Sequence, residues 1–146
     1  MTSTTLLTPT HVWNEKIYSN GWKHPGLGTE DVKEKATGAK LGTIGIASAE
    51  DIAAAAASAR EAQKAWAQLA GPQRGDVLRE AARLVLAHAD ELAEQLVRET
   101  GSIRAKAQWE VHVTARELLE AAALGSQPIG ILTQTMEAGL DRKSVV

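Results

Sequence analysis

The segment between Ser48 and Gly101 constrains the fold most, because it has the pattern of consecutive amphipathic helices. Ser48 is a favourable N-cap residue, and Asp51 follows at the spacing of a capping box. Apolar residues then recur at helical spacing along one face: Ile52, Ala55, Ala56, Ala59, Ala62, Trp66 and Leu69. We therefore predict a first helix over residues 49–70. At the rise of an α-helix it is about 30 Å long, too long to bury its apolar face without a partner.

Turn residues divide the chain after this helix. Gly71-Pro72 ends it, and Pro72 fits the first turn of a second helix. We predict the following helices over residues 72–89, 91–100 and 103–124. Asp90 is the expected N-cap of the third helix, and Glu94 and Arg98 are expected to pair across one of its turns.

The apolar faces of these helices are built mostly from small residues. On the second helix they are Leu78, Ala81, Ala82 and Val85, and on the fourth Ala107, Val111, Thr114, Ala115, Leu118 and Ala122. Aromatic residues make up only 3% of the chain, so the core is thin. Trp66 and Trp109 are expected to be core or interface anchors. We infer that the helices cover another structure and do not form a self-sufficient bundle.

The chain before the helices has the pattern of β-hairpins, which we place within residues 12–47. Asn20-Gly21 is a strong turn signal between short apolar segments. A second hairpin is expected around Thr37-Gly38. Residues 1–10 are expected to form a mobile lead-in, and residues 126–139 an extended, turn-rich segment.

Composition excludes several classes of function. The formal net charge is −2, so we expect no nucleic-acid partner. No apolar run reaches the roughly 20 residues of a membrane span, and the N-terminus lacks the pattern of a secretory signal, so we expect a cytoplasmic protein that is not bound to membranes. The chain contains no cysteine, which excludes a cysteine nucleophile and thiolate metal ligands within it.

No constellation in the sequence has the spacing of an active site. The glycine clusters Gly26-Leu27-Gly28 and Gly42-Thr43-Ile44-Gly45 lack a phosphate-binding pattern and are better explained as turns and an edge strand. The histidines are scattered without metal-ligand spacing: His11, His24, His88 and His112. We therefore predict no catalytic, cofactor-binding or metal-ligating residue in the chain.

The order and spacing of these segments resemble the N-terminal part of the NAD(P)-dependent aldehyde dehydrogenase superfamily from about Lys16 to Gly139. The first hairpin resembles the family in Lys16-Ile17-Tyr18-Ser19-Asn20-Gly21-Trp22, and Ala36-Thr37-Gly38 resembles its second hairpin. The most specific match is Ala59-Arg60-Glu61-Ala62-Gln63-Lys64-Ala65-Trp66 followed by Arg74, Val77-Leu78-Arg79 and Ala81-Ala82. Glu99-Thr100-Gly101 resembles the family's Glu-x-Gly turn.

Two local features refine this resemblance. The family usually has proline before Ala-Thr-Gly, where this chain has Lys35, so the geometry of that turn is open. Gly101-Ser102-Ile103-Arg104-Ala105-Lys106 with Trp109-Glu110 is most similar to the benzaldehyde (aromatic aldehyde) dehydrogenase group.

The resemblance implies an α/β fold for the full-length enzyme. The segment alone is expected to be α+β: N-terminal β-hairpins followed by four amphipathic helices, without a complete Rossmann sheet. Residues 11–140 would be the N-terminal part of the cofactor-binding domain. The full-length enzyme would use NAD or NADP, act on a small aldehyde and form a homo-oligomer, whereas this segment would bind no cofactor.

The chemistry implied by the resemblance is aldehyde oxidation through a cysteine thiohemiacetal, with hydride transfer to the nicotinamide and hydrolysis by a Glu-activated water. This chain has no such cysteine and is expected to be inactive alone. The segment would contribute helical cover and one wall of the substrate tunnel. Candidates for that wall lie on the fourth helix: Glu110, Val113, Thr114 and Glu117.

The resemblance stops after Gly139, and we expect residues 141–146 to be a non-native tail. Asp141-Arg142-Lys143-Ser144-Val145-Val146 is also the translation of part of a common sequencing-library adapter. Reading the underlying codons, and the reading frame after Gly139, tests this expectation.

A stand-alone helical module that binds a protein partner is the alternative to a dehydrogenase segment. Such a module would be a soluble monomer that melts cooperatively. A dehydrogenase segment would expose apolar faces and be poorly soluble.

Overall fold

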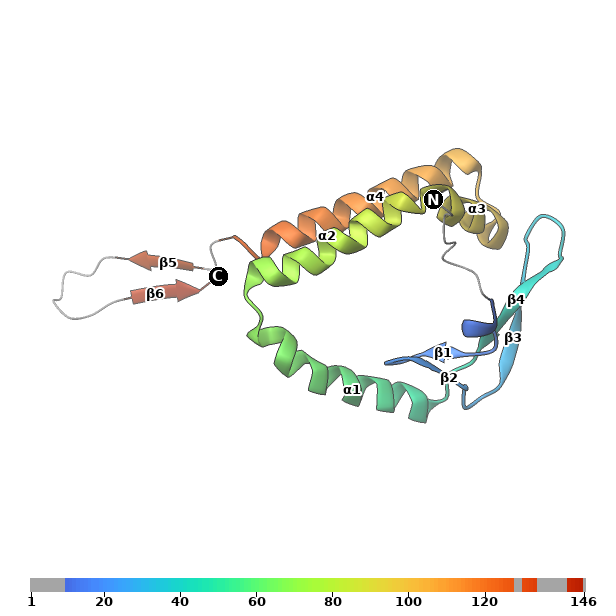
Figure 1. Ribbon diagram of the computed structural model, residues 1–146, viewed down its shortest axis with the longest axis horizontal. Helices are drawn as coiled ribbons and strands as arrows, with labels where there is room; N and C mark the ends of the chain where they lie inside the picture. Colours follow the sequence, from blue (N-terminus) through green and yellow to red (C-terminus); the bar gives the residue numbers. More distant parts are fainter. Residues whose placement is uncertain (1–9, 128–129, 134–141, 146) are drawn as a thin grey trace.

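The hairpins before residue 46 and the helices after residue 70 form two groups, which one long helix connects and which meet again where the second hairpin approaches the third helix (Figure 1). The structure, a computed structural model, describes residues 10–127, 130–133 and 142–145. A 3₁₀ turn over Thr10–Val12 begins the described chain. Most of the predicted lead-in, residues 1–9, lies outside the described residues.

Two antiparallel hairpins form as their turn residues predict. Strands β1 (Ile17–Tyr18) and β2 (Trp22–Lys23) pair across a turn in which Asn20 and Gly21 have φ angles of 51° and 113°. Asparagine and glycine tolerate this left-handed backbone better than other residues. Strands β3 (Thr29–Lys33) and β4 (Lys40–Gly45) form the second hairpin, with a register shift between Val32 and Lys33.

Helix α1 (Ala49–Gln68) begins at the predicted capping box. The Ser48 hydroxyl accepts the Asp51 N–H at 3.1 Å, and the Asp51 carboxylate accepts the Ser48 N–H at 2.9 Å. No residue of α1 is buried, and Trp66 and Leu69 at its end remain 37% and 38% exposed. In the described chain, α1 is therefore stabilised mainly by local helix propensity and its cap, and residues Tyr18, Ser19 and Asn20 of the first hairpin face its middle.

Helices α2 (Gly71–Ala87) and α4 (Arg104–Leu124) lie side by side along most of their lengths (Figure 1). Their contact depends on small residues: Gly75 and Ala82 of α2 and Ala115 and Ala122 of α4 are buried. Small side chains let two helix backbones approach closely, at the cost of less apolar area for each contact.

Helix α3 (Ala89–Thr100) completes the helical unit and ends at Gly101, whose φ is 74°. Its Ala93 is fully buried and packs with Ala107 and Val111 of α4. Partly buried side chains surround this centre: Val85, Ala89, Leu92, Leu96 and Val97. The core is therefore small and aliphatic, as the composition predicts.

Two predictions about α3 are wrong. Its N-cap is His88, which also caps the end of α2, so Asp90 lies inside the first turn. The chain continues into α3 without the extended residue that an Asp cap would need. Glu94 pairs with Arg104, and Arg98 pairs with Glu34, in place of the predicted Glu94–Arg98 pair.

The predicted inner face of α4 needs a smaller correction. Thr114 is exposed and Leu118 is partly buried, so the buried positions are those with alanine or valine. Trp109, predicted as a core or interface anchor, is 63% exposed and is therefore not a core residue of the described chain; its role at an interface remains a prediction.

A third hairpin, β5 (Gly130–Thr133) with β6 (Arg142–Val145), extends away from the helices (Figure 1). It includes part of the predicted extended segment and part of the predicted tail; residues 128–129 and 134–141 lie outside the described residues. The non-native origin of residues 141–146 remains a prediction.

The described elements agree with the predicted α+β segment: small antiparallel hairpins followed by four helices, with no closed sheet among the described residues. Within the same residues, no helix is both long and apolar enough to cross a lipid bilayer.

Candidate functional site: a groove between three helices

A groove of about 670 Å³ opens where α2, α3 and α4 meet. Its lining is mainly apolar, with polar side chains at the edges: Val85, Leu92, Gln95, Leu96, Glu99, Trp109, Glu110, Val111, Val113 and Thr114. Val111 is buried, and the groove therefore rests on the core of the helical unit. Apolar concave surfaces with a few polar groups are typical of small-molecule sites.

The α4 side of the groove follows from helical spacing. Glu110, Val113 and Thr114 are separated by three and four positions, so they share one face of α4. The Thr114 hydroxyl donates to the Glu110 carbonyl at 2.9 Å, within the helix. Lys106 Nζ lies 2.5 Å from Glu110 Oε1, which neutralises the carboxylate at this edge.

The α3 side supplies Leu92 and Leu96, one turn apart, and the polar pair Gln95 and Glu99. The Gln95 side-chain amide donates to the Glu99 carboxylate, so both polar ends already have a partner. The exposed Trp109 ring also lines the groove. A ligand with a flat apolar ring and polar substituents would fit this combination of an apolar lining and polar edges.

Three of the four predicted tunnel residues thus line one groove. Glu117 does not: it lines a separate, smaller depression of about 300 Å³ with Arg116, Leu119 and Glu120. Sequence reasoning missed Trp109 and the leucines of α3 as groove residues. Their one-turn spacing was visible, but the same spacing also describes ordinary core packing.

In both predicted glycine clusters, glycine N–H groups donate hydrogen bonds within the protein. Gly26 N–H donates to the Asp51 carboxylate at 2.8 Å, and Gly45 N–H donates to the Lys16 carbonyl at 3.3 Å. The Asp51 carboxylate thus places negative charge at the start of α1 and occupies the Ser48 and Gly26 N–H groups that could otherwise face an anion. These residues do not fit a dinucleotide phosphate.

Among the residues that the structure describes, no group of three or more His, Asp or Glu side chains could hold a metal ion. The whole chain also lacks cysteine. The groove can hold an apolar ligand, but its own side chains provide no thiolate to attack one.

Relatives of the chain are aldehyde dehydrogenases. Vanillin dehydrogenase from Amycolatopsis sp. is 48% identical over 118 residues, which are 81% of this chain and 24% of that protein. Benzaldehyde dehydrogenase [NAD(+)] from Pseudomonas putida is 36% identical over 121 residues, covering 83% of this chain and 25% of that protein. The chain thus spans about a quarter of the length of these curated relatives.

Solved structures show the same architecture. An NAD-dependent benzaldehyde dehydrogenase from Corynebacterium glutamicum superposes with a TM-score of 0.73 at 25% identity, covering 81% of this chain and 26% of that one. Apo betaine aldehyde dehydrogenase from Staphylococcus aureus, at 21% identity, superposes with a TM-score of 0.84 over 96% of this chain and 28% of that one.

The family assignment covers most of the chain. Residues 22–143 match the aldehyde dehydrogenase family. With the relatives above, this match establishes that the chain belongs to the aldehyde dehydrogenase family.

Proposed function

We propose that this chain is the N-terminal part of the cofactor-binding domain of a cytoplasmic, homo-oligomeric enzyme that oxidises an aromatic aldehyde to the carboxylic acid with NAD or NADP. The observation that carries the proposal is the groove, in which Glu110, Val113 and Thr114 meet an exposed tryptophan ring. Similarity to proteins named vanillin dehydrogenase and benzaldehyde dehydrogenase supports the aromatic substrate class.

In this function the helices play two roles. Their uncovered apolar faces pack on the nucleotide-binding sheet of the complete enzyme, and α4 forms one wall of the aldehyde channel. Because the chain has no cysteine nucleophile, we predict that residues 1–146 have no dehydrogenase activity alone. Because its glycine clusters lack a phosphate-binding pattern, we predict that these residues bind no cofactor.

The exposed apolar side chains favour this proposal over a stand-alone interaction module. Val77, Leu84 and Leu86 of α2 are 53%, 41% and 46% exposed, although α2 is a central helix. A self-sufficient helical module would bury such residues, since each buried side chain of this size contributes about 1.5–3 kcal/mol.

A chimera tests the proposal directly. This chain replaces the matching segment of the Amycolatopsis vanillin dehydrogenase, and NADH formation is measured with benzaldehyde and with vanillin. We expect turnover from the chimera and none from the 146-residue chain alone. A well-folded chimera that binds NAD+ but oxidises neither aldehyde would contradict the proposal.

A melting experiment separates the two functional classes. A sharp, reversible transition of the isolated chain at high solubility would support the interaction module. Aggregation relieved by the remaining part of a dehydrogenase would support the proposed function.

A further inference from the structure

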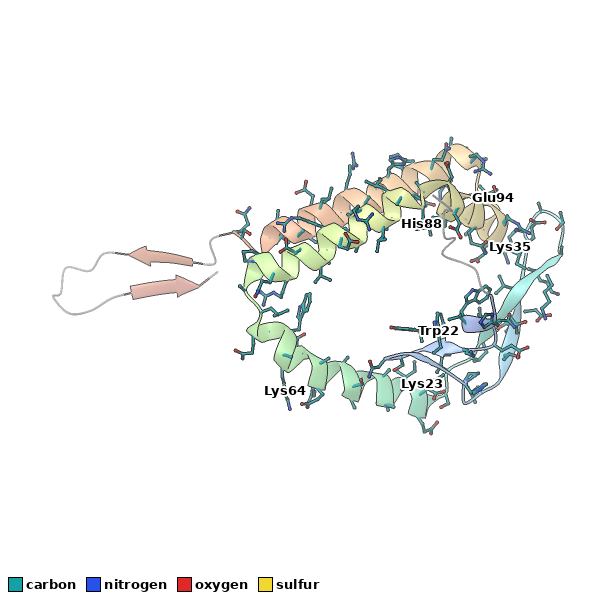
Figure 2. The ribbon with its side chains drawn as sticks, viewed as in Figure 1. Trp22, Lys23, Lys35, Lys64, His88 and Glu94 are labelled. Atoms are coloured by element: carbon teal, nitrogen blue, oxygen red, sulfur yellow. The ribbon has the colours of Figure 1, made fainter. Side chains whose placement is uncertain are left out.

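The β3–β4 hairpin meets the last turn of α3 at a small polar contact that connects the two sides of the molecule. Arg98 Nε lies 2.8 Å from Glu34 Oε1, and Lys35 N–H donates to the Arg98 carbonyl at 2.9 Å. Figure 2 shows Lys35 at the end of the hairpin that approaches α3. We call the contacts among Glu34, Lys35 and Arg98 the clasp.

The hairpin holds Glu34 in position before it meets Arg98. The Thr37 hydroxyl donates to the second carboxylate oxygen of Glu34. Glu34 also pairs through its backbone, donating to the Ala39 carbonyl at 2.8 Å and accepting the Gly38 N–H at 2.8 Å. A carboxylate already fixed by its neighbours loses less conformational entropy when it binds an arginine.

The Glu34 side of the clasp is more buried than the exposed ion pairs of α2. The Glu34 side chain is 18% exposed and Arg98 43%, whereas the Glu80 and Arg83 side chains are 56% and 62% exposed. Water screens a pair of the second kind more strongly. Glu34 and Arg98 are also far apart in sequence, so their contact restrains the tertiary arrangement and not a single helical turn.

Helix α3 connects the clasp to the groove. Arg98 does not line the groove, but the next residue, Glu99, does, as do Leu92, Gln95 and Leu96 of the same helix. Gly101, which follows α3, also packs closely against the hairpin: a Cβ built on Gly101 would lie 3.3 Å from the Lys35 Cβ. The hairpin therefore fixes where this end of α3 lies.

We propose that Arg98 is a positioning residue, which sets the α3 wall of the groove by anchoring the end of that helix to the β3–β4 hairpin through Glu34 and Lys35. This inference rests on the proposed function of the groove. The clasp itself can be tested without a substrate.

Hydrogen exchange of the chimera described above, read by mass spectrometry on peptides, tests the clasp. In Arg98→Ala we expect exchange to become roughly two- to fivefold faster both in the peptide containing Lys35 and in the groove-lining part of α3. Arg98→Lys retains a positive charge without the planar guanidinium and should restore part of the protection. Arg83→Ala removes the exposed α2 pair and should leave both peptides unchanged.

A second pair of variants keeps the test independent of any general loss of stability. Glu34→Gln weakens the ion pair and leaves α3 itself unaltered, and exchanging the charges in Glu34→Arg with Arg98→Glu should recover protection. Faster exchange at the hairpin with no change in α3 would overturn the proposal, and so would unchanged exchange at both. These readouts do not depend on aldehyde binding, so an inactive chimera with an intact clasp would reject only the proposed function.

Discussion

Gly71 and Gly125 touch backbone to backbone where α2 begins and α4 ends. A Cβ built on Gly71 would lie 1.8 Å from the Gly125 carbonyl oxygen, and one built on Gly125 would lie 2.5 Å from the Gly71 carbonyl oxygen. One turn further along α2, a Cβ on Gly75 would lie 2.7 Å from the Ala122 carbonyl oxygen. The two helices are therefore as close as their main chains allow at this end.

Replacing Gly75 with alanine should destabilise the helical unit. Alanine normally stabilises a helix interior by about 1 kcal/mol relative to glycine, so a loss would point to the helix contact. We expect a net loss of about 1–3 kcal/mol, as for other overpacked sites, measured by urea unfolding followed by circular dichroism. Val77→Ala, at an exposed position of the same helix, is the control and should change stability by less than about 0.5 kcal/mol. A more stable Gly75→Ala variant would show that α2 and α4 can move apart at this contact without losing stability.

Enlarging the core at Ala107 should have a similar cost. Ala107 is fully buried against Ala93 and Val111, so Ala107→Leu must displace its neighbours. We expect a loss of about 1–3 kcal/mol. Ala105→Leu, at an exposed position of the same helix, should stay within about 0.5 kcal/mol of the parent. Equal stabilities of the two leucine variants would mean that the core has space that the structure does not show.

Acid should loosen the start of α1. The pKa of Asp51 lies below its ordinary value of 3.8, first because its carboxylate accepts the Ser48 N–H and then the Gly26 N–H. A depressed pKa in the folded state means that the stabilisation is present above about pH 4 and is lost as pH falls through the folded pKa. We expect the Ser48 and Gly26 amides to lose protection only below this range. In Asp51→Asn this pH dependence should disappear, and protection lost already near neutral pH in the parent would refute it.

Among the helices, trypsin should cut α1 before α2. Arg60 and Lys64 lie on a helix with no buried residue, whereas Arg79 and Arg83 lie on α2, which packs along α4. Cleavage requires local unfolding, and that costs less where fewer apolar contacts are lost. Mass spectrometry of early products should therefore show cuts after Arg60 or Lys64. Earlier cleavage after Arg79 or Arg83 would contradict the packing described here.

Groove substitutions in the chimera should raise the KM for aromatic aldehydes. Val113→Asp places a charge in the apolar lining, and we expect KM to rise at least tenfold, equivalent to about 1.4 kcal/mol. His112→Ala, outside the groove, should leave KM unchanged. Glu117→Ala tests whether the wall extends one turn further along α4, as the sequence predicts. An unchanged KM in Val113→Asp would place the aldehyde elsewhere.

Sequence reasoning succeeded where structure is determined by neighbouring residues. The Ser48–Asp51 cap and the Asn20-Gly21 turn are each specified within a few residues, and both formed as predicted. The start of α1 follows from the same local signal, whereas α3 begins at Ala89 and not after an Asp90 cap. The resemblance to aldehyde dehydrogenases supplied the family, which the residue chemistry alone could not.

The failures involve partners that are distant in the chain. Arg98 was expected to pair one turn away, but its partner is Glu34, 64 positions earlier. Gly71 was read only as a helix break, although its lack of a side chain also permits the contact with Gly125. The family resemblance pointed to Glu110, Val113 and Thr114 of α4, which line the groove. It did not identify the opposite wall, and periodicity could not supply it, because a helical period does not show which other helix it will face.

Because no residue of α1 is buried, the length of this helix matters more than the identity of its side chains. One end is fixed by the Ser48 cap and the other by the turn before α2, so the helix length sets the separation between the hairpins and the helical unit. Removing a single alanine from its middle would shorten the helix by about 1.5 Å and rotate everything beyond it by about 100°. Residues 34 and 98 could then no longer meet, so the number of alanines should tolerate less change than their identity.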